Sequence, residues 1–316
     1  MKRDPVRVQR VHVFIKKRVD NANQQNIPGH RRPVVQIDES YANEALATQL
    51  SRFHDDDDDY FQRPKGKGRR LCFADAIVTN SDGTTHFVRG ARWIFEAKSK
   101  AAASKNDDYH SAFNHNNWEK WVMNRVLPNI PASSIIQCDN AAYNNVDNRL
   151  QTHVSAMKKA ECREFLARYG SKDTYEKGYD DAWLVPRLKE EVRKYVEPAW
   201  ERKAKQLGHV VWRQPPYSSS FLNDIEKVWG VVKNAVARRY TNGRTLQETR
   251  KQLEEEFAKV KPADLNAIVK HNDKVRQQWI ADNVKLDELE DGASASDDDT
   301  DSDSGLSGDE DDDDDQ

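Results

Sequence analysis

Cysteine is scarce in this chain of 316 residues, and its three cysteines lie far apart. Cys72, Cys138 and Cys162 are odd in number and form no CxxC pair. This pattern argues against a disulfide framework and against a zinc ribbon, and it is typical of a protein in a reducing compartment.

Long apolar runs are also missing. No segment approaches the roughly 20 apolar residues that cross a bilayer, and the first ten residues, MKRDPVRVQR, lack the apolar core of a signal peptide. Hydrophobic residues make up 37% of the chain and charged residues 33%, which is polar for a globular protein. We therefore expect an intracellular protein without a membrane segment.

Charge is unevenly distributed, although the formal net charge is only -3. Residues 287–316 hold sixteen of the 53 acidic residues and none of the 50 basic ones, so residues 1–286 carry a formal charge of +13. A basic body predicts a polyanionic partner that is bound in a salt-dependent manner. The acidic tail holds too little apolar surface to order itself. It is interpreted as a solvating tail. The alternatives are that it mimics DNA and inhibits the basic body electrostatically, or that it binds basic nuclear proteins such as histones.

Apolar runs between turn residues predict five strands. They are VVQID (34–38), RLCFADAIV (70–78), THFVRGARWIFEA (85–97), SSIIQCD (133–139) and HVVWRQPP (209–216). Helical spacing of apolar residues predicts helices over 116–127, 154–170, 185–206, 245–260 and 263–280, and one that begins at Asn223. This order predicts an α/β fold with a ribonuclease H-like mixed sheet, three antiparallel strands followed by two parallel ones, flanked by helices.

The same order predicts the domain organisation. Residues 1–33 are interpreted as a basic lead-in or linker, and residues 34–240 as the ribonuclease H-like domain. Residues 150–207 are expected to be a helical insertion before the last core helix. C-terminal helices over 241–286 and a disordered acidic tail over 287–316 complete the chain.

Three acids stand where such a sheet would bring them together. Asp38 and Asp139 end predicted strands, and Glu226 lies in the first turn of the helix after the last strand, although the three are 101 and 87 positions apart. Three carboxylates at one edge of a sheet repel one another unless a cation neutralises them. Two oxygen-liganded Mg²⁺ ions at such a place activate a water or hydroxyl and stabilise a leaving oxygen.

Five ordered blocks of the sequence resemble the Tc/mariner superfamily of DDE transposases. They are IDESY (37–41), KGKGRRL (65–71), DDYHSAFNHNNWEKWV (107–122), LPNIPASSIIQCDNAAYNN (127–145) and GHVVWRQPPYSSSFLNDIEKVWGVVK (208–233). The resemblance covers roughly residues 34–240 and implies a DDE endonuclease core with two Mg²⁺ or Mn²⁺ ions, DNA cleavage by water and strand transfer by the freed 3′-hydroxyl. The family acids fall on Asp38, Asp139 and Glu226, which become the expected catalytic and metal-binding residues.

The chain departs from the family pattern in three ways. Asp224 stands where the family commonly has proline, at the first helical position, and adds an acid beside the expected site. The gap before Glu226 is longer than usual, which the insertion explains. Family members usually begin with paired helix-turn-helix domains, and we expect none within residues 1–33.

Each candidate residue also has a purely structural interpretation. Glu226 fits a capping box with Asn223, and Asp38 and Asp139 singly fit turn formers. Glu39 is assigned a structural role because it points to the opposite side of its strand, Asp75 is the main competing acid, and Trp229 is assigned to the core face of its helix.

Flanking residues complete the candidate site. Asn140 is expected to orient Asp139 through a hydrogen bond. Asp55–Asp59 is interpreted as a solvated loop, and His110 and His115 are left without a metal-binding role. Contacts to the DNA backbone are expected from basic residues, as an alternative to a plain basic loop. These residues are Lys65, Lys67, Arg69, Arg70 and Lys233.

Three functions are compatible with the sequence. The first is a metal-dependent DNA endonuclease and strand transferase. The second is a transposase-derived nuclear DNA-binding protein that no longer transposes, and the third is an acidic-tailed nuclear interaction protein. A nuclear location is expected for each of them, and a homodimer is left open.

Overall fold

The computed structural model describes residues 5–24, 31–48, 66–97, 113–150, 152–170, 181–215 and 221–283. Several sequence predictions fall outside these ranges. They concern Lys65, the Asp55–Asp59 run, His110 and the tail over 287–316.

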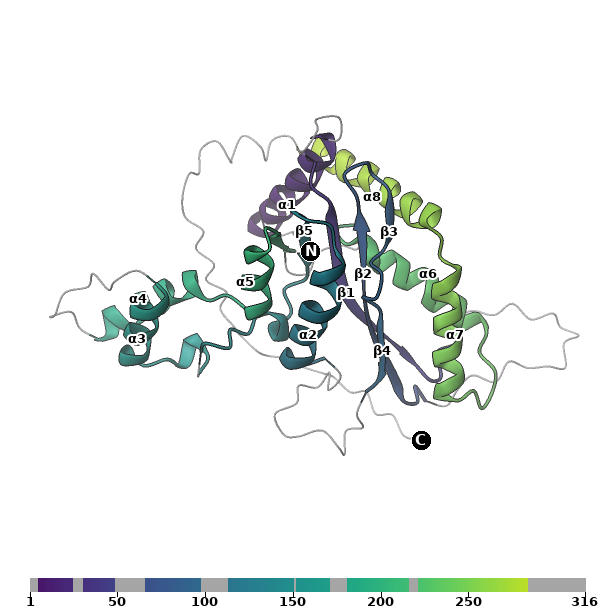
Figure 1. The fold of residues 1–316 in the computed structure, drawn as a ribbon, viewed down its shortest axis with the longest axis horizontal. Helices are drawn as coiled ribbons and strands as arrows, with labels where there is room; N and C mark the ends of the chain where they lie inside the picture. Colours follow the sequence, from purple (N-terminus) through teal and green to yellow (C-terminus); the bar gives the residue numbers. More distant parts are fainter. Residues whose placement is uncertain are drawn as a thin grey trace, which may run out of the picture.

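A six-stranded mixed sheet forms the centre of the molecule (Figure 1). Its strands are β1 (Val34–Asn43), β2 (Arg70–Thr79), β3 (Thr85–Phe87), β4 (Trp93–Glu96), β5 (Ile135–Cys138) and β6 (Val210–Arg213). The order is β3-β2-β1-β5-β6, and β4 also pairs with β2. The strands β1 to β4 pair antiparallel, whereas β5 is parallel to both β1 and β6. The predicted mixed sheet is therefore confirmed.

The predicted third strand is two strands. β3 ends at Phe87 and β4 begins at Trp93, and both pair with β2. Between them the backbone turns, with the N–H of Ala91 bonded to the carbonyl of Val88 and with Gly90 at φ +77. Glycine adopts this left-handed conformation without the penalty that a Cβ brings, so the single run of the prediction is broken there.

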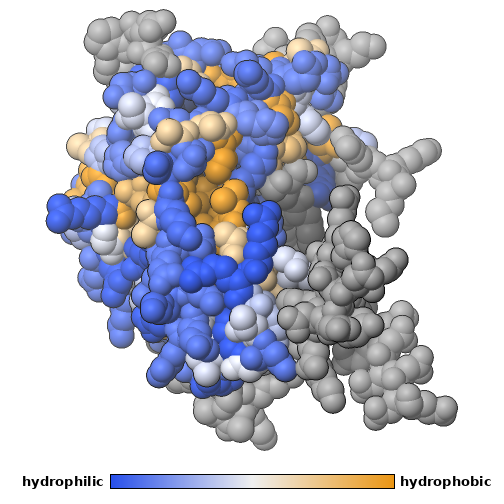
Figure 2. Space-filling view, turned by 90° about the vertical axis from the view of Figure 1, so that its right-hand side faces the viewer, coloured by the Kyte–Doolittle hydropathy of each residue, from blue (hydrophilic) through white to orange (hydrophobic). Residues whose placement is uncertain are grey.

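Helices cover both faces of the sheet (Figure 1). One face packs against α2 (His115–Trp121), which continues as the π-helix η3 (Val122–Val126) and the short turn η4 (Leu127–Asn129), and against α5 (Ala199–Gln206). The other face packs against α6 (Asp224–Arg238), α7 (Leu246–Lys259) and α8 (Pro262–Asp282). On the side of the molecule that carries these three helices, hydrophilic residues dominate the surface and hydrophobic residues show in a central band (Figure 2).

The N-terminal segment, predicted to be a basic lead-in, is a helix. α1 (Pro5–Asn23) buries Val11, Phe14 and Ile15 in a cluster with Leu222, just before α6. It also lies beside α8. Residues 5–23 thus form part of the folded body. The prediction missed this helix because it considered the basic character of residues 1–33 and not the apolar stripe along one helical face.

Residues 150–207, which were predicted to be an insertion, contain two further helices that project away from the sheet (Figure 1). These are α3 (Lys159–Tyr169) and α4 (Asp181–Tyr195), which pack together around their own small apolar cluster. The predicted helix over 185–206 is divided into α4 and α5, with Pro198 capping α5. Proline has no N–H for helical hydrogen bonds, so the helix is interrupted between Tyr195 and Ala199. No helix in the described part of the chain is long and apolar enough to span a bilayer.

Candidate active site

Two of the predicted acids lie at the same edge of the sheet. β1 and β5 run parallel, with Gln36 opposite Gln137. Two positions further along each chain stand Asp38, still within β1, and Asp139, directly after β5. Carboxyl ends of adjacent parallel strands are a frequent location of ligand sites in α/β folds, and the parallel register brings together two acids that are 101 positions apart.

The third acid is brought to this edge by α6. Asn223 is the N-cap of α6, as predicted, but its side chain accepts no backbone N–H, so the predicted capping box does not form. The Asn223 side chain is hydrogen-bonded to the Glu226 carboxylate instead. The backbone N–H of Ile225 donates to the Gln36 side chain at 3.2 Å, which joins the first turn of α6 to β1.

Trp229 has a polar role in addition to its place in the core. Its indole Nε1–H donates to Oδ2 of Asp38 at 2.9 Å, while its ring packs edge-on against Phe73 and Phe257. Its place in the apolar stripe of the helix had predicted only a role in the core. The spacing held a signal, because a residue three positions after Glu226 lies on the same side of the helix.

The electrostatics of the three acids favour a cation. Burial raises the pKa of Asp38 well above its ordinary value, and the charges of Asp139 and Glu226 raise it further, while the Trp229 hydrogen bond lowers it. Burial also raises the pKa of Asp139 and of Glu226. Such shifts show that three negative charges are unfavourable there without a counter-charge. Clusters of this kind are candidates for functional sites.

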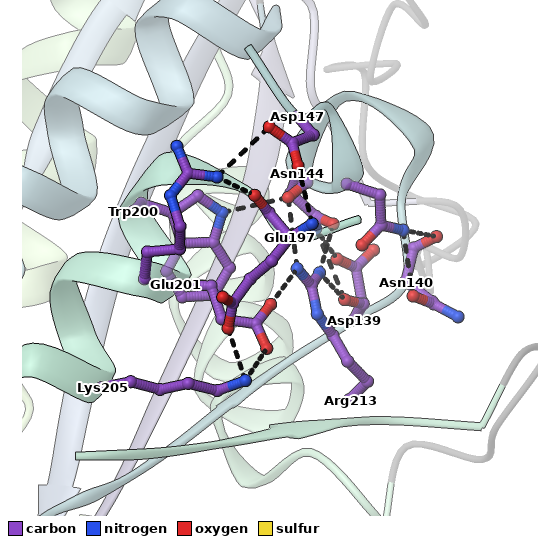
Figure 3. Close-up of polar contacts among 11 residues, drawn as sticks. Asp139, Asn140, Asn144, Asp147, Glu197, Trp200, Glu201, Lys205 and Arg213 are labelled. Atoms are coloured by element: carbon purple, nitrogen blue, oxygen red, sulfur yellow. Dashed lines mark hydrogen bonds and ion pairs between the residues drawn. The ribbon is translucent and has the colours of Figure 1, made fainter. Parts of the chain in front are cut away.

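Asp139 is oriented by a different residue from the predicted one. Asn144 Nδ2 donates to Asp139 Oδ1 at 2.7 Å (Figure 3). The side chain of Asn140 accepts a hydrogen bond from Asn145 instead. The turn η5 (Ala142–Asn145) bends the chain back, so the residue five positions after Asp139 faces its carboxylate.

Glu39 is a fourth acid close to this edge. Burial and the charges of Asp38 and Asp139 raise its pKa well above the ordinary value. Its Oε2 is buried and makes no hydrogen bond within the described part of the chain. It also lies close enough to raise the pKa of the buried thiols of Cys72 and Cys138. The prediction of a structural role on the opposite side of the strand fits this apolar setting, but Glu39 is not electrostatically independent of the site.

Two other acids near the site are paired with arginine. Asp75 is buried and accepts from Arg92 Nε at 2.7 Å, which removes it as a competitor for the site. Asp224 is fully buried and accepts hydrogen bonds from Arg18 and Arg276. The predicted effect of Asp224 as an extra negative charge beside the site is therefore corrected, because two guanidinium groups neutralise it.

The basic residues predicted to contact DNA differ in their surroundings. Arg69 pairs with Glu44 and Glu96 on the surface. Arg70 lies over the ring of Tyr41 at 4.2 Å. Lys233 lies on the same helix as Glu226, and its Nζ donates to Ser40 Oγ at 3.4 Å. Burial lowers the pKa of Lys233, and the charge of Asp38 raises it. Lys67 lies in an irregular exposed segment.

The donor chemistry of the site fits an oxygen-liganded divalent ion. Asp38, Asp139 and Glu226 supply carboxylate oxygens, the ligands that Mg²⁺ and Mn²⁺ prefer. Among the described residues, no group of three or more His, Cys, Asp or Glu side chains is arranged so that it could hold a metal ion. His115 pairs with Glu119 at 3.2 Å on α2.

Comparison with solved structures shows the fold. The chain is similar to the Mos1 transposase paired-end complex with left transposon end, with a TM-score of 0.52 and 11% identity over 89% of this chain. A pre-cleavage Mos1 transpososome matches with a TM-score of 0.50 and 10% identity over 89% of this chain. This chain spans 63% and 64% of the length of those two proteins.

In sequence, no family profile and no curated protein matches the chain. The fold is therefore assigned from structure. It is similar to the fold of Mos1 transposase, with a ribonuclease H-like mixed sheet.

Proposed function

We propose that the chain is a DDE-type DNA endonuclease and strand transferase that uses divalent metal ions. The observation that carries this proposal is the position of Asp38, Asp139 and Glu226 on two parallel strand ends and the helix packed against them. The raised pKa values of all three acids support it, because buried carboxylates with perturbed pKa values are candidates for functional sites. The likeness of the fold to Mos1 transposase supports the same reaction class.

In this proposal the three carboxylates hold two Mg²⁺ or Mn²⁺ ions. When bound, the ions supply a nucleophile at neutral pH and stabilise the leaving oxygen. The Trp229 indole holds Asp38 in one orientation, and Asn144 does the same for Asp139. Asn223 restrains Glu226 at the start of α6. Fixing the carboxylates in this way reduces the reorganisation that binding would otherwise require.

The reaction proposed for this site is phosphodiester exchange. Water adds to phosphorus, the bond from phosphorus to the 3′-oxygen breaks, and that oxygen leaves as a 3′-hydroxyl after it takes up a proton. In strand transfer, a 3′-hydroxyl attacks a second phosphodiester, and the oxygen displaced there takes up the proton. DNA is the proposed substrate because residues 1–286 carry a formal charge of +13, and because the Mos1 structure is a complex with a transposon end.

Nicking of supercoiled plasmid tests the proposal. We expect the purified chain to convert supercoiled DNA to the open circle with Mg²⁺ or Mn²⁺, and EDTA to stop the reaction. Asp139→Asn should abolish nicking. Asp82→Asn, which makes the same chemical change in the β2–β3 turn, is the matched control and should leave nicking unchanged.

Two outcomes would contradict the proposal. DNA binding without any metal-dependent cleavage would favour the alternative function, a DNA-binding protein that no longer transposes. Nicking that persists in Asp139→Asn would point to a contaminating nuclease or to a site elsewhere on the chain.

A further inference from the structure

Asp139 lies where three segments of the chain meet (Figure 3). Its own loop contributes Asn144, which donates to Oδ1 at 2.7 Å, and the backbone N–H of Ala141, which also bonds the carboxylate. The last residue of β6, Arg213, donates from Nη1 to the backbone carbonyl of Asp139 at 3.3 Å and to Asn144 Oδ1 at 2.6 Å. The amide of Asn144 is thereby held between the carboxylate and the guanidinium.

Arg213 is held in turn by the helical insertion. Its Nη2 donates to Asn144 O at 3.2 Å and pairs with Glu201 of α5 at 3.1 Å. The neighbouring Trp200 donates from Nε1 to Asn144 O at 3.0 Å, and its ring lies 5.0 Å from the Arg213 guanidinium. Helix α5 is therefore linked to the Asp139 carboxylate through a chain of three side chains.

We propose that Asn144 and Arg213 are positioning residues for Asp139, and that Glu201 extends this positioning to the insertion. The inference rests on the proposed function of Asp139 as a metal-binding residue. An amide alone could rotate, because its oxygen and nitrogen ends are nearly equal in shape. The guanidinium removes this freedom, since it accepts no hydrogen bond and so requires the amide oxygen on its own side. The NH₂ of Asn144 is then turned toward Asp139.

A second group of ion pairs joins α5 to the loop after β5, and it allows an effect on the position of Asp139 to be distinguished from an effect on general stability. Asp147 is buried and pairs with Arg149 at 2.6 Å and with Arg202 of α5 at 3.2 Å. Arg202 and Arg213 resemble each other in exposure, with 25% and 21% of their side chains exposed. Both arginines fasten α5 to the loop after β5, but only Arg213 contacts Asp139 or Asn144. Arg202 is thus a matched control for Arg213.

Binding of Mn²⁺ to the full chain, followed by electron paramagnetic resonance of the free ion, tests the inference without relying on activity. We expect Asn144→Ala and Arg213→Met to weaken Mn²⁺ binding by about 10- to 100-fold, the usual effect of removing a group that orients a metal ligand. Arg202→Met should leave Mn²⁺ affinity within about threefold of wild type, and so should Asn145→Ala, whose side chain bonds Asn140 rather than Asp139. Nicking by the Asn144 and Arg213 variants should recover toward the wild-type rate at high Mn²⁺, because the ion compensates for a poorly oriented ligand.

Glu201 is tested by a double-mutant cycle. If Glu201 acts through Arg213, then Glu201→Gln weakens Mn²⁺ binding in wild type and has no further effect in Arg213→Met. Thermal unfolding of each variant shows whether it is folded. Arg213→Lys provides a milder change, since an ammonium cannot reproduce the planar fork, and its affinity should lie between wild type and Arg213→Met.

The outcomes separate the two proposals. Unchanged Mn²⁺ affinity in folded Asn144→Ala and Arg213→Met, with tight binding by wild type, overturns the positioning role and leaves the proposed function intact. Equal losses in Arg213→Met and Arg202→Met also overturn it, because they would indicate a general effect of loosening α5. Failure of wild type to bind Mn²⁺ overturns the proposed function, and this inference with it.

Discussion

Trp229 joins the hydrophobic core to the candidate active site at the scale of a single residue. Its ring packs with Phe73 and Phe257, while its indole N–H stabilises the charged form of Asp38. Trp229→Phe keeps most of the apolar contact and removes the hydrogen bond. A hydrogen bond to a charged group stabilises the charged form, so its loss should raise the pKa of Asp38 further above its ordinary value.

This prediction is checked by a ¹³C NMR titration of the Asp38 carboxyl. A proton on Asp38 competes with a cation, so the acid limb of metal-dependent nicking should move to higher pH in Trp229→Phe. Trp212→Phe, in β6, is the control, because Trp212 packs against Phe14 and lies in a different cluster from Trp229. Unshifted titration in Trp229→Phe would show that the hydrogen bond contributes nothing to the ionisation of Asp38.

Asp75 predicts a pH-dependent stability at the same scale. Burial raises the pKa of Asp75 to about 6, although Arg92 lowers it. The folded state then binds the proton more tightly than the unfolded state, so the stabilising contribution of protonation is full below about pH 4 and is lost as pH rises through about 6. Asp75→Asn lacks this titration. Between about pH 4 and pH 7, the free energy of unfolding of wild type should fall relative to Asp75→Asn by on the order of 2–3 kcal/mol. Urea unfolding across this range measures the difference, and a constant difference would contradict it.

At the scale of elements, Asp224 joins four segments of the fold. Its carboxylate accepts from Arg18 of α1 at 3.1 Å, from Asn272 of α8 at 2.7 Å, and from Arg276 of α8 and Gln36 of β1. α6 therefore begins at a point that is fixed from three sides. The position of Glu226 and Trp229 depends on this fixed start, because both residues lie within the next turn and a half of the helix.

Asp224→Pro tests whether the network or the helix start dominates. Proline suits the first helical position. Its missing N–H costs no hydrogen bond within the helix there, because the first N–H groups of a helix have no partner in the helix. Arg18 nonetheless loses its buried ion pair with Asp224, and Arg276 keeps only the one with Asp273, and breaking a buried pair in this way costs about 3–5 kcal/mol. We expect Asp224→Pro and Asp224→Ala to be destabilised by similar amounts in urea unfolding. A stability of Asp224→Pro near that of wild type would mean that the buried arginines find other partners.

At the scale of the whole molecule, a basic body and an acidic tail share one chain. Deleting residues 287–316 changes the formal charge from -3 to +13. We expect the shortened chain to bind duplex DNA more tightly at low salt, with a steeper dependence on salt concentration, because the tail no longer competes for the basic surface. Fluorescence anisotropy of labelled DNA at several salt concentrations measures both quantities. The same affinity and slope in both chains would exclude competition by the tail.

Much of the fold could be predicted from local pattern. Alternating and continuous apolar runs located the strands around Asp38, Asp75 and Asp139, since burial on a sheet imposes that pattern. The helix starting at Asn223 was found from its cap and its apolar stripe. The break at Gly90 was missed, because a turn between two short strands leaves the apolar content of the run unchanged.

The partners of individual side chains could not be predicted. Asn140 was expected to orient Asp139, but the turn after β5 presents Asn144 instead. Asp224 was expected to add a negative charge beside the site, because its partner Arg18 lies 206 positions earlier, in a segment interpreted as a lead-in. Pairings over such distances follow from the packing of whole elements, and periodicity within a window of residues contains no information on them.

The sequence by itself predicted which acids are candidates for the site and that parallel strands would bring Asp38 and Asp139 to one edge, because apolar pattern specifies strands and strand order follows from chain connections. Only the tertiary structure decided what surrounds those acids. The hydrogen bond from Trp229, the link from Asn144 through Arg213 to α5 and the neutralisation of Asp224 each depend on where helices settle on the sheet. Packing of apolar faces sets those positions to within a fraction of an ångström, and the polar contacts at the site are a consequence of that packing.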